Sequence, residues 1–207
     1  MRNRRLQGRI TAGRFTLPAV ILICIVCWIG TSILLPAMSS EKEAGYALWQ
    51  SVCTLYLPAW ADRVISFMLY AAIGYFLIEL NNTFAIIRMR ASVQTSIYFL
   101  LVTICPGMHL LYAGDIAAVA FLISLFFLFK SYQHPRPVSY IFHSFVFIGA
   151  GSLLFPQLLY FIPLWLIGAY YFQSLTARSF CAALIGLSVS YWFLFGHAFF
   201  FIVDTYI

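Results

Sequence analysis

The chain has 207 residues, of which 63% are hydrophobic and only 9% are charged, and its mean hydropathy is +0.94. Soluble domains carry about 25% charged residues, so this composition excludes a soluble globular protein. The net charge of +6 does not indicate a nucleic-acid partner. The basic residues lie in the N-terminal tail and in short gaps between apolar runs, without a basic face of interleaved aromatic residues outside those runs.

The chain begins with a basic segment, residues 1–14, which we predict to be a cytoplasmic tail, and an apolar run follows over residues 15–37. A signal peptide has the same order, and Ala37-Met38-Ser39 loosely resembles a cleavage site. The run is longer than the apolar core of a signal peptide, which has about 7–15 residues, and it is long enough to cross about 30 Å of hydrocarbon. The sequence therefore predicts a retained first transmembrane helix, with cleavage as the alternative.

A long aromatic-rich gap follows the first apolar run. Glu41-Lys42-Glu43 opens this gap, and apolar residues recur at near-helical spacing over residues 44–60, where Pro58 stops a helix. This pattern predicts an amphipathic segment on the outer membrane surface. Further predicted spans cover residues 62–84, 92–109 (broken near its end by Pro106-Gly107), 115–130, 138–155, 158–175 and 179–203. The predicted fold is all-α, with about seven transmembrane helices in a single domain over residues 15–207.

The basic residues occupy alternate gaps between these spans. If the N-terminus is cytoplasmic, all but two of the 12 basic residues lie on the inner side: Arg2, Arg4, Arg5, Arg9, Arg14, Arg88, Arg90, Lys130, Arg136 and Arg178. The positive-inside rule therefore predicts an N-in, C-out protein of the bacterial inner membrane. The uncharged link Phe155-Pro156-Gln157 leaves open a re-entrant hairpin in place of the fifth and sixth spans, because such a hairpin keeps the flanking gaps on the same sides.

Glu79 is the one acidic residue that lies away from the first position of a predicted span, and Asn81 and Asn82 follow it closely. A carboxylate in hydrocarbon is costly and usually faces a bundle interior or a cavity. These three residues are therefore candidates for a substrate or proton path. The alternative is that Glu79 pairs with a cation of the inner gap, such as Arg88 or Arg90.

Three residues are candidates for catalysis. His109, Asp115 and His197 would all lie at the outer level of the membrane, and two imidazoles with one carboxylate suit zinc binding or acid–base chemistry. The alternative is that each histidine only bonds a neighbouring helix. None of the four histidines shows the spacing of a helical metal site, so the sequence predicts no metal and no cofactor.

Cysteines and small residues indicate packing. Cys24 and Cys27 have CxxC spacing but lie in the middle of a span, which favours a packing role over a redox motif. Cys53 and Cys105 would both lie on the outer side, where a disulfide between them is an alternative.

Small residues gather in two of the predicted spans, at Gly149-Ala150-Gly151-Ser152, at Gly186 and at Ser188-Val189-Ser190. Small residues let helices approach each other closely, so these positions predict helix–helix contacts.

The region from Leu80 to Tyr191 resembles a family of uncharacterised bacterial multi-pass inner-membrane proteins. The resemblance rests on Asn81 to Arg90, the Pro106 break, His134-Pro135-Arg136-Pro137, Phe147 to Pro156, Leu164-Trp165-Leu166-Ile167-Gly168, Arg178 and Gly186. It implies an inner-membrane location and no catalytic residues. Members of that family are longer, so the resemblance leaves open whether helices beyond the seventh span are missing here.

Three functions fit the sequence. The leading hypothesis is a non-enzymatic component of envelope assembly or of a larger membrane complex, whose partners are the lipid bilayer and other membrane proteins. The first alternative is a membrane-embedded enzyme acting on lipid- or isoprenoid-linked glycans, which would use the outer histidines and Asp115. The second alternative is a small-solute transporter that uses Glu79.

Overall fold

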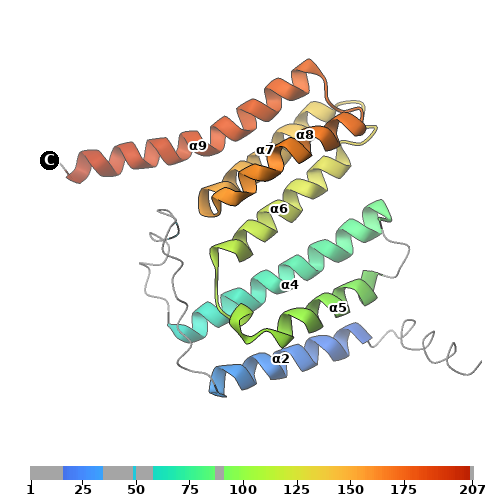
Figure 1. Cartoon of the computed structure of the whole chain (residues 1–207), viewed down its shortest axis with the longest axis vertical. Helices are drawn as coiled ribbons and strands as arrows, with labels where there is room; N and C mark the ends of the chain where they lie inside the picture. The colour runs from blue at the N-terminus through green and yellow to red at the C-terminus, as the bar shows by residue number, and fades with distance from the viewer. Residues whose placement is uncertain (1–15, 35–48, 50–57, 87–90, 206–207) are drawn as a thin grey trace, which may run out of the picture. The chain divides into compact units, whose positions relative to one another are not determined.

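The computed structural model describes residues 16–34, 49, 58–86 and 91–205 (Figure 1). Every regular element in these ranges is helical, which confirms the all-α class. The elements are α2 (Thr16–Leu34), α4 (Ala59–Phe84), α5 (Ala91–Ile104), η1 (Pro106–His109), α6 (Ala113–Lys130), α7 (Pro137–Leu154), η2 (Pro156–Phe161), α8 (Ile162–Tyr171) and α9 (Ala177–Thr205).

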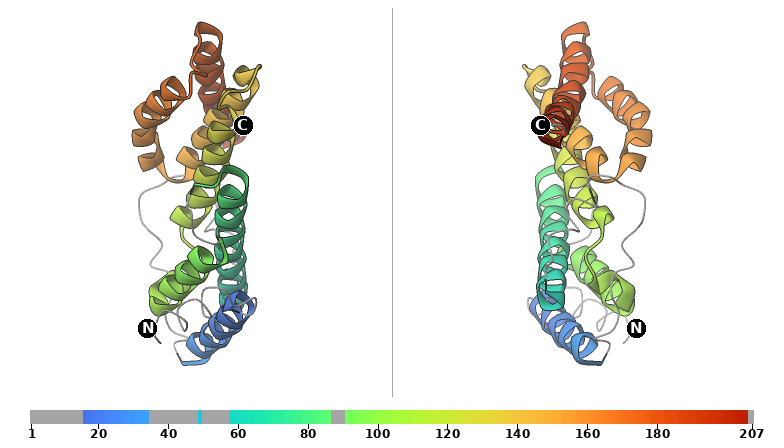
Figure 2. Two further views of the ribbon diagram at one scale, coloured as in Figure 1. Left: turned by 90° about the vertical axis from the view of Figure 1, so that its right-hand side faces the viewer. Right: turned by 90° about the vertical axis from the view of Figure 1, so that its left-hand side faces the viewer.

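The chain divides into two compact units. Unit 1 contains α2, α4, α5, η1 and the start of α6 up to Asp115. Unit 2 contains the rest of α6 from Ile116, together with α7, η2, α8 and α9. In unit 2, η2 reverses the chain between α7 and α8 (Figure 2).

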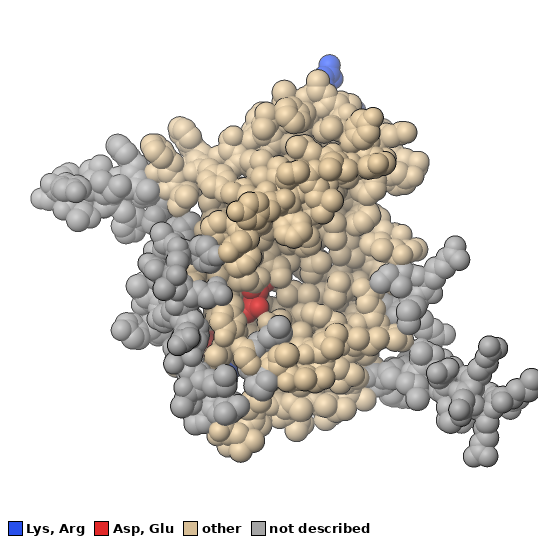
Figure 3. Space-filling view, viewed as in Figure 1, with Lys and Arg blue, Asp and Glu red and all other residues tan. Residues whose placement is uncertain are grey.

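Four helical stretches are long and apolar enough to cross a membrane: Trp60–Phe84, Ala113–Lys130, Pro137–Leu154 and Ala177–Gly196. A helix of 18 residues is about 27 Å long, which is close to the hydrocarbon thickness of about 30 Å. The face in Figure 3 carries very few charged atoms over its described part. The chain is therefore a membrane protein.

Prolines set where several predicted spans begin and end. α5 stops at Ile104, two residues before Pro106, so the break expected in the third span is present. The predicted span 158–175 is divided, because Pro156 starts η2 and Pro163 lies in the first turn of α8. α8 has 10 residues and is only about 15 Å long, less than the thickness of a bilayer core. Most of the predicted outer segment lies outside the described residues, and its last two residues begin α4.

Glycines bring α7 and α9 into close contact in unit 2. A Cβ atom on Gly186 would lie 2.8 Å from the backbone oxygen of Phe142, and one on Gly149 would lie 2.7 Å from Oγ of Ser190. Ser190 Oγ also donates a hydrogen bond of 3.1 Å to the Val146 carbonyl of α7. The close helix contacts predicted from these small residues are confirmed.

A buried hydrogen-bond network joins α6, α7 and α8 inside the apolar core of unit 2. Ser124 Oγ donates to the Ser144 carbonyl at 2.7 Å, and Ser144 Oγ donates to the Ser124 carbonyl at 2.8 Å. Trp165 Nε1 donates to Ser124 Oγ at 2.8 Å. Apolar side chains of α7, such as Ile141 and Ile148, belong to the same core. Each polar group is thus satisfied within the core, as burial requires.

We expect Trp165→Phe to lower the free energy of unfolding of the protein by about 1–3 kcal/mol. The change removes a buried donor and leaves a small void beside the two serines. Thermal unfolding in detergent, followed by circular dichroism, measures the effect. Trp192→Phe is the matched control, because Trp192 is 73% exposed on α9; equal losses for both variants would contradict the structural role of the network.

Candidate functional site

Unit 1 contains a group of buried polar and aromatic side chains around Trp28 of α2. The Trp28 ring stacks on the imidazole of His109, with centroids 3.8 Å apart and an interplanar angle of 20°. It also approaches the rings of Phe67 and Tyr70 of α4, at 5.4 and 5.9 Å. We call Trp28, Thr31, Tyr70, His109 and Asp115 the Trp28 cluster.

The hydroxyl of Thr31 lies within hydrogen-bond distance of both the Trp28 carbonyl and the imidazole of His109. Thr31 Oγ1 donates to the Trp28 carbonyl at 2.9 Å and lies 2.8 Å from Nδ1 of His109. A hydroxyl has one proton to donate, so when Thr31 donates to the Trp28 carbonyl it accepts from a protonated Nδ1. Nε2 of His109 is then an unprotonated acceptor, and it is buried with no hydrogen-bond partner in the described part of the chain.

The environment of His109 favours its neutral form. His109 is 2% exposed, and this burial lowers the pKa of its imidazole below the ordinary value of 6.5. The backbone of Thr103 opposes the shift, while the positive charge of Arg63 adds to it. The ring is therefore neutral at pH 7, and Nε2 can accept a proton or a hydrogen bond.

Asp115 lies in the first turn of α6, and both of its carboxylate oxygens are engaged. Tyr70 donates its hydroxyl to Oδ1 at 2.7 Å, and the backbone N–H of Tyr112 donates to Oδ2 at 3.0 Å. The position at a helix N-terminus also favours a negative charge. This carboxylate ties α4 to the start of α6 and holds the Tyr70 ring beside Trp28.

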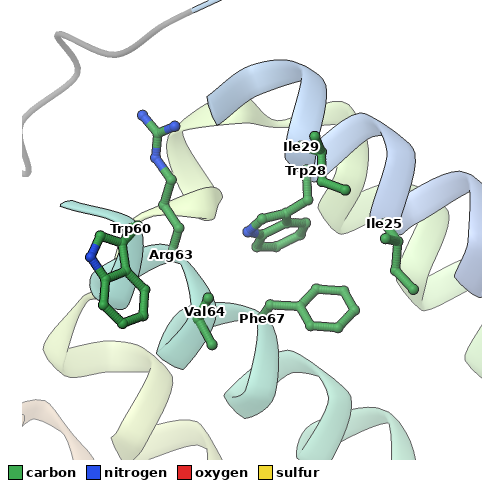
Figure 4. Close-up of a pocket in the computed structure, with 7 residues that line it drawn as sticks. All are labelled: Ile25, Trp28, Ile29, Trp60, Arg63, Val64 and Phe67. Carbon is green, nitrogen blue, oxygen red and sulfur yellow. The ribbon is translucent and has the colours of Figure 1, made fainter. Parts of the chain in front are cut away.

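An apolar cavity adjoins the cluster between α2 and α4. It has a volume of about 230 Å³ and is lined by Ile25, Trp28, Ile29, Trp60, Arg63, Val64 and Phe67. Trp28 and Phe67 project into the space between the two helices, while Arg63 and Trp60 lie together toward one end (Figure 4). The cavity thus combines apolar walls with one cationic side chain, which suits a molecule with an apolar chain and an anionic group.

The structure brings His109 and Asp115 into one cluster, with Trp28 and Tyr70 between them. His197 lies in α9, but its side chain is outside the described residues. The sequence therefore identified two members of the cluster. Trp28, Thr31 and Tyr70 were missed, although the spacing of three residues places Trp28 and Thr31 on one face of a helix.

The residues of the predicted polar path do not converge. Glu79 is half-buried near the end of α4, where Thr83 Oγ1 donates to its carboxylate at 3.3 Å. Asn81 is buried and its carbonyl accepts from the N–H of Ala85, whereas Asn82 is exposed. Glu79 and Asn81 point about 200° apart around the helix. Arg88 and Arg90 lie outside the described residues, and a transport role for Glu79 stays a prediction.

The cysteines of unit 1 are consistent with packing. Cys24 is buried and accepts a hydrogen bond of 3.0 Å from Thr103 Oγ1, whereas Cys27 is exposed. Cys105 is a free, exposed cysteine, and Cys53 is outside the described residues. Among the described residues, no group of three or more His, Cys, Asp or Glu side chains is arranged to hold a metal ion.

Comparison of the chain with models of protein families, with characterised proteins and with solved structures finds no match.

Proposed function

We propose that the chain is a multi-pass protein of the bacterial inner membrane, N-in and C-out, with a membrane-embedded enzyme site in unit 1. The substrate class is a glycan linked to a lipid or isoprenoid phosphate, bound at the outer face. The observation that carries this proposal is the neutral His109, whose buried Nε2 has no partner in the described part of the chain. The ring stacks on Trp28, which also lines the cavity that holds Arg63.

Each residue of the site would have a different role in the reaction. The apolar walls of the cavity would hold the lipid or isoprenoid chain, and Arg63 would attract its phosphate. His109 Nε2 would take the proton of an attacking hydroxyl as a general base. The leaving lipid phosphate would keep the electron pair of the broken bond, and Arg63 would stabilise its charge. Asp115 would act as a positioning residue, because it holds Tyr70 against Trp28.

His109→Gln tests the proposal. In a strain that lacks the gene, lipid-linked glycans are extracted and compared by mass spectrometry after complementation with the wild type or the variant. We expect the unprocessed glycan to accumulate in the deletion strain and with His109→Gln, because loss of a general base lowers a rate by about 10²–10⁴-fold. His143→Gln is the control: His143 is exposed in α7, and its Nδ1 lies 2.6 Å from the Ser139 carbonyl of its own helix.

The non-enzymatic component of envelope assembly or of a larger complex is the rival proposal. It is favoured by the aromatic side chains of Trp192, Phe193 and Phe195, which are 67–73% exposed on α9 and could contact a membrane-protein partner. Full complementation by His109→Gln, together with a stoichiometric partner after affinity purification from native membranes, would replace the enzyme proposal with this one.

A further inference from the structure

Unit 2 contains a second cavity, which is larger and more basic than the one in unit 1. Its volume is about 1000 Å³, and it lies between the start of α7 and the start of α9. Arg136 and Arg178, which are both exposed, line it. Neither guanidinium pairs with a carboxylate in the part of the chain that the structure describes.

The sequence of unit 2 explains why these charges are not neutralised from within. From Ile116 to Val203 the chain has no aspartate or glutamate, whereas Lys130, Arg136 and Arg178 are all in this stretch. The two cavity arginines therefore present a local positive charge to whatever occupies the space between them. The start of α7 adds to this field, because the helix has no side-chain cap on its first N–H groups.

Apart from the two arginines, Ser139 and Thr176, the residues that line the cavity are apolar, as expected for a lipid site. Val138 and Phe142 of α7 face it, as do Ala182 and Ile185 of α9. These apolar side chains lie within about two turns beyond the arginines, inside the stretches that are long and apolar enough to cross a membrane. A free phosphate ion would need neither this volume nor these apolar walls.

We propose that this cavity binds an anionic phospholipid. The phosphate of the headgroup lies between Arg136 and Arg178, and an acyl chain runs along Phe142 and Ile185. Basic pockets between transmembrane helices on the cytoplasmic side bind anionic headgroups in this way. In the proposed N-in topology the site faces the inner leaflet. It is independent of the Trp28 cluster, so failure of the enzyme proposal leaves it standing.

Native mass spectrometry of the full-length protein in detergent tests the proposal. Phosphatidylglycerol is the probe, and phosphatidylcholine with the same acyl chains is the comparison lipid. We expect the wild type to retain phosphatidylglycerol preferentially. The double variant Arg136→Gln, Arg178→Gln is expected to weaken that retention by about 30-fold and to leave phosphatidylcholine unaffected. Equal retention of the two lipids by the wild type, or unchanged retention by the double variant, would overturn the proposal.

Two further variants separate a shaped site from general attraction by charge. Lys130→Gln removes a cation of the same unit that does not line the cavity, and it should retain phosphatidylglycerol as the wild type does. Ala177→Trp fills the cavity from an exposed position and keeps both arginines, and it should lose the lipid. If Lys130→Gln weakens binding as much as the double variant, or Ala177→Trp does not weaken it, no shaped site exists.

Added inorganic phosphate gives the last comparison. At equal ionic strength it should not displace phosphatidylglycerol from the wild type, because the acyl chain contributes to binding. Full displacement would show a small-anion site and would contradict the assignment to a lipid.

Discussion

Gly186→Val is expected to lower the free energy of unfolding by about 1–3 kcal/mol. The Cβ atom alone would lie 2.8 Å from the Phe142 backbone oxygen and 3.3 Å from the backbone nitrogen and a methyl group of Val146. Two of these three neighbours are backbone atoms of α7, so no side chain can rotate away to relieve the contact. The helices must separate, and the contact at Gly149 then weakens too.

Gly196→Val in the same helix is the matched control. Among the described residues, and leaving aside the backbone of its own helix and its chain neighbours, no atom lies within 4 Å of the position that a Cβ would take on Gly196. This variant therefore gains helix propensity without a clash and should be neutral or slightly stabilising. Unfolding in mixed micelles with increasing sodium dodecyl sulfate, followed by circular dichroism, measures both. Similar midpoints for the two variants would mean that α7 and α9 do not pack at Gly186.

Much of the helical architecture follows from two simple sequence signals. The lengths of the apolar runs predicted the helices α4, α6, α7 and α9. A single apolar run crosses lipid as a helix, because a helix pairs all of its backbone N–H and C=O groups internally. Gly149 and Gly186 predicted where two of them meet. Pro106 predicted the end of α5, since a proline has no N–H to continue the helix.

The buried hydrogen bonds and ring contacts between helices were harder to predict, because they depend on which helices become neighbours. Ser124 and Ser144 stand in apolar runs like many other membrane serines, and only the fold brings their hydroxyls to Trp165. A tryptophan in a membrane helix is usually expected at the water interface, so Trp28 gave no sign that it would stack on a histidine. His109 and Asp115 were found only because polar side chains are rare in such a sequence.

Tyr70→Phe is expected to cost about 1.5–3 kcal/mol of unfolding free energy, the value of a buried hydrogen bond to a charged group. Asp115 is 8% exposed, so when the 2.7 Å bond from Tyr70 is lost, little water can replace it. The phenylalanine keeps the ring beside Trp28, so the loss reports on the hydroxyl and not on packing. Tyr75→Phe, at a position on α4 that is 62% exposed, should have almost no effect.

A double-mutant cycle with Asp115→Asn then separates the bond from the two side chains. The amide of the asparagine keeps the shape of the carboxylate but accepts a weaker hydrogen bond. Asp115→Asn should therefore lower the free energy of unfolding less in the Tyr70→Phe variant than in the wild type. We expect a coupling of at least about 1 kcal/mol between Tyr70 and Asp115. Additive losses of unfolding free energy in detergent would mean that the side chains of Tyr70 and Asp115 do not share a hydrogen bond. Asp115 would then not hold Tyr70 against the Trp28 ring, on which His109 stacks.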